Sequence, residues 1–125
     1  MATTDLSNYD AAGVPKGTGL RLGLVVSAWN AEVTDALRDG AMETLLKHGV
    51  AFKDIHEVQV PGSYELALGA QLLMEHRPLD GVICIGSVVR GETPHFDFVC
   101  HAAAQGIMEV GLKTGQPVIF CVLTD

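Results

Sequence analysis

The sequence has few cysteines, few basic residues and no long apolar run, and each shortage excludes a class of protein. Its 3 cysteines form no CxxC pair, which argues against a secreted disulfide scaffold. The 8 basic residues stand against 15 acidic ones, a net charge of -7 that disfavours nucleic-acid binding. No apolar stretch approaches the roughly 18 residues of a membrane span. The polar start MATTDLSNYD is unlike a signal peptide. We therefore expect a cytoplasmic protein that binds neither nucleic acid nor membranes.

Metal and nucleotide signatures are also missing. The 5 histidines do not show the spacing of a zinc site, and His95 and His101, six residues apart, fall on different faces of a helix. No phosphate-binding GxxxxGK[ST] motif occurs. We therefore expect no metal ion in this chain.

What the sequence does contain is enough apolar material for one compact domain. The chain has 125 residues, of which 48% are hydrophobic and 18% charged. Short apolar runs rich in β-branched residues predict buried strands over residues 20–27 and 80–87. Two further strands are predicted over residues 55–60 and 118–123.

Between these runs, apolar residues recur at three- and four-residue steps. This spacing predicts helices over residues 33–48, 66–74 and 99–110. Asn30 stands where a helix cap is favoured, and Gly49 where the first helix is expected to end.

Alternation of strands and helices predicts an α/β three-layer sandwich, with a four-stranded parallel sheet and helices on both faces. We assign residues 1–19 to an extended N-terminal arm and residues 20–125 to the α/β domain. No helical segment follows the last predicted strand, so part of the sheet is expected to be poorly covered or to have an edge that needs a partner.

Ligands of open parallel sheets bind beyond the carboxyl ends of the strands. Trp29 follows the first predicted strand, where its indole either stacks on a flat heterocycle or simply closes the rim of the core. Ser63 is a possible cap for the second helix. Glu65 lies in that helix's first turn, where a carboxylate is favoured by the helix dipole with or without a substrate.

The segment from Arg90 to His95 carries the sharpest signal. It is a turn that leads into a helix, so backbone N–H groups converge there and favour an anion such as phosphate. Pro94 suits the helix start because its missing N–H costs little there. His95 would stand beside the anion and can exchange a proton near neutral pH.

Four segments, taken together and in this order, resemble the lumazine synthase family. They are VVSAWN (residues 25–30), VPGSYEL (60–66), RGETPHFDFV (90–99) and PVIFCVLT (117–124). The resemblance runs from about Leu6 to Asp125. It implies a flavodoxin-like fold and an enzyme that condenses 5-amino-6-(D-ribitylamino)uracil with 3,4-dihydroxy-2-butanone 4-phosphate. It also implies no cofactor, and a homopentamer or larger assembly with active sites between subunits.

The same resemblance implies a role for each matching residue. His95 would transfer protons, Trp29 would stack on the uracil ring and Phe120 would come from a neighbouring subunit. The implied substrate-binding residues are Trp29, Asn30, Ser63, Tyr64, Glu65, Val88, Val89 and Phe120. The implied phosphate-binding residues are Gly91, Glu92 and Thr93.

The sequence departs from the family pattern at its end. The family continues with a segment that supplies an arginine to the substrate phosphate, and with C-terminal helices that are missing here. We therefore expect a truncated chain whose phosphate binding is impaired. Two alternatives stay open: a flavin- or lumazine-binding module without turnover, and a shell-forming protein. A generic flavodoxin-like protein is disfavoured, because the first turn lacks a phosphate-binding loop rich in Ser, Thr and Gly.

Overall fold

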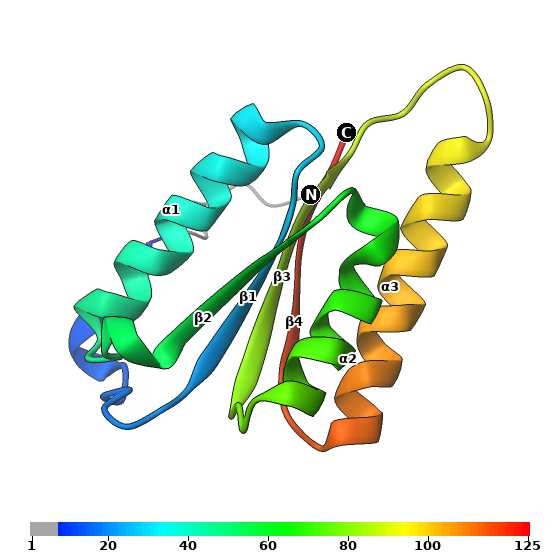
Figure 1. Ribbon diagram of the computed structural model, residues 1–125. Helices are drawn as coiled ribbons and strands as arrows, with labels where there is room; N and C mark the ends of the chain where they lie inside the picture. The colour runs from blue at the N-terminus through cyan, green and yellow to red at the C-terminus, as the bar shows by residue number, and fades with distance from the viewer. Residues whose placement is uncertain (1–7) are drawn as a thin grey trace.

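A computed structural model describes residues 8–125, and its elements alternate as the apolar runs predict (Figure 1). The strands and helices, in chain order, are β1 (Leu22–Ser27), α1 (Ala31–Lys47), β2 (Ile55–Val60), α2 (Leu66–His76), β3 (Gly81–Val88), α3 (His95–Thr114) and β4 (Val118–Thr124). Three short 3-10 helices complete the described chain: η1 (Ala11–Gly13), η2 (Phe52–Asp54) and η3 (Ser63–Glu65). Each predicted strand and helix is confirmed, with boundaries that shift by a few residues.

The four strands form one parallel sheet in the order β2-β1-β3-β4. This order is that of a flavodoxin-like sheet, so the expected fold class is confirmed. The two central strands are buried on both faces, and Leu24, Val25, Cys84 and Ile85 are all 0% exposed. Their continuous apolar runs therefore reflect two covered faces.

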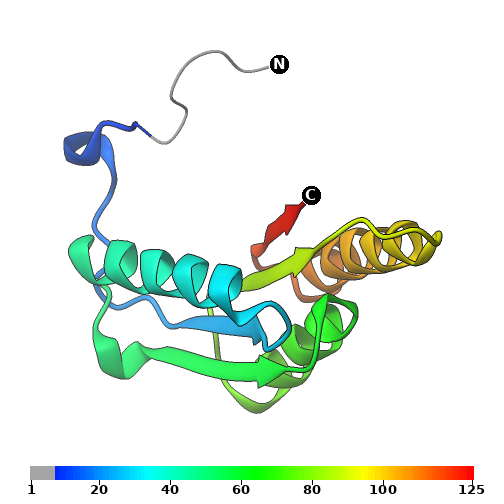
Figure 2. The same cartoon turned by 90° about the horizontal axis from the view of Figure 1, so that it is seen from above.

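Helices cover the two faces of the sheet unequally. Helix α1 packs on one face, while α2 and α3 lie side by side on the other (Figures 1 and 2). Met42 packs with Leu24 on the α1 side, and Ile107 packs with Val25 on the opposite side. These clusters are the two apolar layers of the expected three-layer sandwich.

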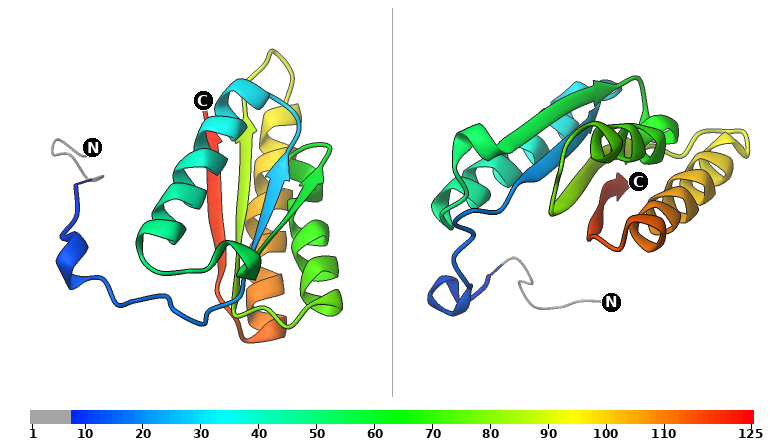
Figure 3. Two further views of the ribbon diagram at one scale, coloured as in Figure 1. Left: turned by 60° about the vertical axis from the view of Figure 1, so that its left-hand side comes forward. Right: turned by 60° about the horizontal axis from the view of Figure 1, so that its bottom comes forward.

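Strand β4, at the edge of the sheet, is the least covered of the four. Ile119 is 49% exposed, Leu123 is 51% exposed and Phe120 is 44% exposed, whereas β3 is almost wholly buried. The expectation of a poorly covered part of the sheet is confirmed at this strand. Figure 3 shows β4 beside β3. Helix α1 packs mainly against β1 and β3.

Two expected helix caps are wrong in detail. Asn30 directly precedes α1 but its side chain makes no capping hydrogen bond; only its carbonyl accepts from the N–H groups of Val33 and Thr34. The Ser63 hydroxyl also turns inward, toward β3. By contrast, α1 does end before Gly49, whose φ of 97° is the left-handed conformation that favours glycine.

The first seven residues of the assigned arm lie outside the described residues, so the division at residue 19 stays a prediction. The rest of the arm contains η1 and meets the end of α1, where the Gly17 N–H donates to the His48 carbonyl at 2.7 Å. The Tyr9 hydroxyl also lies 3.0 Å from His48 Nε2. Within residues 8–125 no helix combines the length and apolarity needed to cross a bilayer.

Candidate functional site

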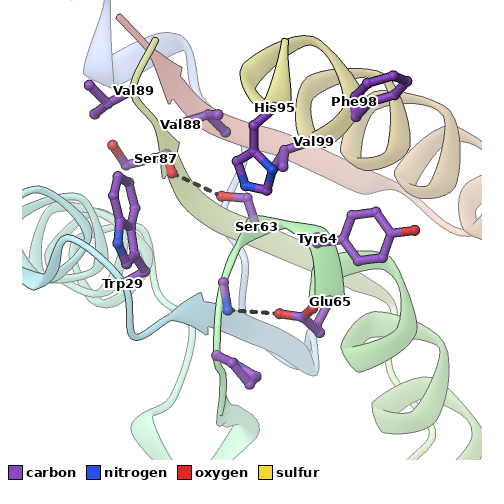
Figure 4. A pocket seen from close by; sticks show the side chains of 12 residues that line it. Trp29, Ser63, Tyr64, Glu65, Ser87, Val88, Val89, His95, Phe98 and Val99 are labelled. Atoms are coloured by element: carbon purple, nitrogen blue, oxygen red, sulfur yellow. Dashed lines mark hydrogen bonds between the residues drawn. The ribbon is translucent and has the colours of Figure 1, made fainter. Parts of the chain in front are cut away.

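A cavity of about 820 Å³ opens at the carboxyl ends of β1, β2 and β3 (Figure 4). It lies where an open parallel sheet is expected to bind a ligand. Its walls come from the β1–α1 turn, the β2–α2 turn and the β3–α3 loop with the start of α3. The lining residues are Trp29, Pro61, Gly62, Ser63, Tyr64, Glu65, Ser87, Val88, Val89, His95, Phe98 and Val99.

Trp29 and His95 both line this cavity. Trp29 lies in the turn that follows β1 and is 52% exposed. Its backbone is held to the next loop, because the Trp29 N–H donates to the Pro61 carbonyl at 3.1 Å. Figure 4 shows the indole on one side of the cavity and the His95 ring on another, with space between them. The two side chains therefore face the same cavity.

The β2–α2 turn provides a carboxylate that is already engaged. Glu65 Oε1 accepts a hydrogen bond from the Gly62 N–H at 2.9 Å, which satisfies a backbone donor at the start of η3 (Figure 4). This hydrogen bond gives Glu65 a structural role that does not depend on a ligand. The same carboxylate lines the cavity, and a carboxylate accepts several hydrogen bonds at once, so it can also receive ligand hydroxyls.

The end of β3 adds a serine that the sequence did not single out. Ser87 is 4% exposed and lines the cavity. Its hydroxyl accepts a hydrogen bond from Asn30 Nδ2 at 3.0 Å, and its carbonyl accepts one from the Ser63 hydroxyl at 3.2 Å (Figure 4). The side-chain amide of Asn30, a candidate for substrate binding, is therefore directed at β3.

The loop between β3 and α3 is open to solvent. The loop begins after β3, where the Arg90 N–H donates to the carbonyl of Asp125, the residue that follows β4, at 2.8 Å. The Arg90 guanidinium stacks on the Phe96 ring, 4.3 Å from its centroid, and lies 4.0 Å from an Asp97 oxygen. The N–H of His95 approaches the Thr93 hydroxyl oxygen at 3.4 Å. This arrangement leaves the Arg90 charge partly balanced by Asp97.

The structure gathers some of the candidate residues and separates others. Those that line the cavity are Trp29, Ser63, Tyr64, Glu65, Val88, Val89 and His95. Those that do not are Asn30, Gly91, Glu92, Thr93 and Phe120. Phe120 instead lies in a separate groove between α3 and β4, with Met108 and Leu112. Within one copy of the chain, Phe120 therefore does not belong to the cavity that contains Trp29 and His95.

Sequence reasoning overlooked Ser87, Phe98 and Val99 as cavity walls. Two signals were available. Ser87 stands at the carboxyl end of a predicted strand, and Phe98 and Val99 follow His95 by three and four residues, which places them beside it on one helix face.

No cysteine is among the residues that line the cavity. Burial raises the pKa of Cys84 to about 12 and also raises that of Cys121, so both thiols stay protonated at neutral pH. Across residues 8–125, no three His, Cys, Asp or Glu side chains gather in a way that could hold a metal ion.

Comparison with known proteins gives a consistent result. Residues 19–125 match the family described as 6,7-dimethyl-8-ribityllumazine synthase. A protein of that name from Cytophaga hutchinsonii is 49% identical over 123 residues, which cover 98% of this chain and 77% of the relative. Its counterpart from Parabacteroides distasonis is 48% identical over 126 residues, covering 99% of this chain and 79% of the relative.

Proposed function

Because this chain belongs to the 6,7-dimethyl-8-ribityllumazine synthase family, we propose that it forms 6,7-dimethyl-8-ribityllumazine in the cavity at the strand ends. The observation that carries the proposal is the presence of Trp29 and His95 in one cavity of about 820 Å³. A cavity of this size suits a small reactant pair. An aromatic plate binds a flat ring, and a histidine beside it moves protons.

In this proposal, the pyrimidine ring of 5-amino-6-(D-ribitylamino)uracil stacks on Trp29. Backbone groups of Ser63, Tyr64, Val88 and Val89 meet its polar atoms. Asn30, which does not line the cavity, would contribute through its hydrogen bond to Ser87. Glu65 accepts hydrogen bonds from the ribityl hydroxyls while it keeps its bond to the Gly62 N–H. The ring is thereby fixed with its amine toward His95.

The reaction needs protons at several steps. The amine attacks the ketone of 3,4-dihydroxy-2-butanone 4-phosphate, and loss of water gives an imine. Phosphate then leaves, and the second amine closes the ring with loss of another water. His95 takes and returns protons during these steps. Most of the rate enhancement would come from holding the two reactants together, which suits a cavity without a thiol nucleophile.

The phosphate would sit at the exposed loop before α3. Gly91, Glu92 and Thr93 precede that helix, whose first N–H groups and dipole favour an anion. Thr93 adds a hydroxyl, which already lies 3.4 Å from the His95 N–H. His95 would then stand close to the leaving group.

We also propose that the protein assembles as a homopentamer or a larger shell whose sites are shared. Supporting this, α3 and β4 expose a set of large apolar side chains that water would not ordinarily face. They are Phe98, Met108, Leu112, Ile119, Phe120 and Leu123. Phe120 lies outside the cavity of its own chain, and its partly exposed position on β4 supports the proposal that it reaches a neighbour's cavity. A cytoplasmic location and independence of cofactors belong to the same proposal.

The proposal is tested by supplying both substrates to the purified 125-residue chain and following lumazine absorbance. A reaction without the butanone phosphate is the control. We expect absorbance only when both substrates are present, and no loss when EDTA is added. A chain that is folded and binds lumazine or riboflavin, but forms no product even when the butanone phosphate is in large excess, would instead be a binding module without turnover.

A further inference from the structure

Ser87, near the end of β3, connects two of the three loops that form the cavity. It lies in β3, and its two hydrogen-bond partners lie in the turns that follow β1 and β2. Its hydroxyl accepts from Asn30 Nδ2 at 3.0 Å across 57 residues of sequence, and its carbonyl accepts from the Ser63 hydroxyl at 3.2 Å across 24 residues. Figure 4 shows Ser87 between Trp29 and Ser63. The walls of the cavity are therefore held in relation to one another at this residue.

Asn30 matters because it directly follows Trp29. It is in the left-handed conformation, with φ 58° and ψ 54°, and it is the only non-glycine residue with positive φ among those described. This conformation is costly for most residues, but asparagine tolerates it. The turn at Asn30 sets the direction in which α1 leaves the sheet and thereby the place of the Trp29 ring.

The side chain of Asn30 has a competing local partner. Asparagine before a helix usually adopts an extended backbone and accepts a hydrogen bond from an N–H of the first turn. Here it makes no such bond and donates to Ser87 instead. Removing the Ser87 hydroxyl would allow Asn30 to rotate toward the ordinary cap, and the preceding Trp29 would move with it.

Burial makes this bond effective. Ser87 and Ser63 are each 4% exposed, and Asn30 is half-buried, so water competes weakly for these groups. The Trp29 ring itself is half exposed and its own packing cannot fix it firmly. Its position therefore depends on the backbone that carries it.

We propose that Ser87 is a positioning residue for the substrate ring. Through Asn30 it holds the turn that presents Trp29, and through Ser63 it holds the facing wall. The link to a substrate ring rests on the proposed function, whereas the link to Trp29 does not.

The test uses Trp29 as a reporter, because it is the only tryptophan in the chain. Acrylamide quenching and anisotropy of its fluorescence are measured for Ser87→Ala, for Asn30→Gly and for the double variant. Asn30→Gly breaks the same bond but keeps a residue that accepts positive φ. Thr114→Val is the control, since it removes a hydroxyl at the far end of α3, bonded to the Val110 carbonyl at 2.8 Å.

We expect Ser87→Ala to increase Trp29 quenching and lower its anisotropy, while Thr114→Val changes neither. The KM for the pyrimidine substrate should rise by about three- to tenfold, the range of one lost hydrogen bond, with kcat changed less than about twofold. In the Asn30→Gly background, Ser87→Ala should have little further effect on either quantity, because the bond is already lost.

Unchanged Trp29 fluorescence and KM in folded Ser87→Ala would overturn the proposal. So would an effect of Ser87→Ala that is as large in the Asn30→Gly background as in the native chain. If Ser87→Ala does not fold, unchanged Trp29 fluorescence in Asn30→Gly overturns it equally. If the native chain makes no lumazine, the proposed function fails, while the fluorescence measurements still decide the role of Ser87.

Discussion

Ser63 and Ser87 form a buried wall of the cavity, whereas the loop of residues 89–94, of which Val89 alone lines the cavity, is exposed to solvent along its whole length. The buried wall carries hydrogen bonds that join the β1–α1 and β2–α2 turns to each other and to the end of β3. The exposed loop is held mainly at its ends, by the Arg90 backbone at the sheet edge and by the start of α3.

This difference suggests how the two ends of a ligand are bound. The side that faces a flat ring is already shaped, because its polar groups are paired and covered by protein. The side assigned to phosphate is open, where electrostatic attraction is screened by water and salt. Ring recognition is therefore expected to depend on packing, and phosphate recognition on backbone donors.

The largest effect is expected on the rate. His95→Gln removes the proposed proton carrier and should lower kcat for lumazine formation by about 100-fold. The side chain is exposed, so the thermal unfolding midpoint should not change. His101→Gln, an exposed histidine further along α3, is the matched control and should retain the native rate. Equal rates for the two variants would show that His95 does not carry the proton.

A second pair of variants compares the packing of the buried wall with that of the exposed loop. A methyl group at Gly86 would meet Ser63 Oγ and lie 2.9 Å from Leu66 Cδ1, whereas at Gly91 it would meet nothing within 4 Å. Gly86→Ala should therefore lower the free energy of unfolding by about 1–3 kcal/mol, and Gly91→Ala should change it by less than about 0.5 kcal/mol. Urea unfolding measures both. If both substitutions were equally harmless, the buried wall would not be tightly packed.

Cys84 gives a pH-dependent test of the buried side. Its pKa is raised by burial to about 12 in the folded chain, above the unfolded value, so unfolding releases its proton at high pH. This group's contribution to stability is full below pH 9, and is lost by about 1.4 kcal/mol per pH unit between roughly pH 9 and 12. Cys84→Ala should flatten the fall in unfolding free energy between pH 9 and 10.5. Parallel curves for the two proteins would contradict this assignment.

The smallest effect is expected at the exposed loop. Arg90 and Asp97 are 64% and 58% exposed and 4.0 Å apart, so their ion pair is weakened by solvent. Asp97→Asn should cost less than about 1 kcal/mol, including the loss of a negative charge at the start of α3. The cost should shrink further in 0.5 M salt. A larger cost that is insensitive to salt would mean that this loop is more firmly held than its exposure indicates.

Much of the fold follows from local patterns. The strand at residues 55–60 has the boundaries that the sequence predicts, and α1 ends before Gly49 as expected. Such signals are local because strand and helix periodicity depend on residues close in sequence. The position of the cavity also followed, since parallel strands end at the same edge of the sheet.

The hydrogen-bond partners of individual side chains could not be predicted from the sequence. Asn30 was expected to cap α1 but donates to Ser87, and the Ser63 hydroxyl donates to the Ser87 carbonyl. Both bonds join separate segments of the chain, and a local alternative was available to each donor. Nothing near Asn30 in the sequence indicates whether its side chain bonds to the first turn of α1 or to Ser87.

The sequence by itself determined the helices and strands, the parallel direction of the strands and the end of the sheet where a ligand is expected. Each of these depends on short-range periodicity and on general rules of chain connection. Only the tertiary structure decided that Trp29 and His95 share one cavity, that Ser87 joins its walls and that Phe120 lies outside it. The physical reason is that a hydrogen bond or a cavity wall depends on atoms within a few ångströms, and those atoms come from segments that only folding brings together.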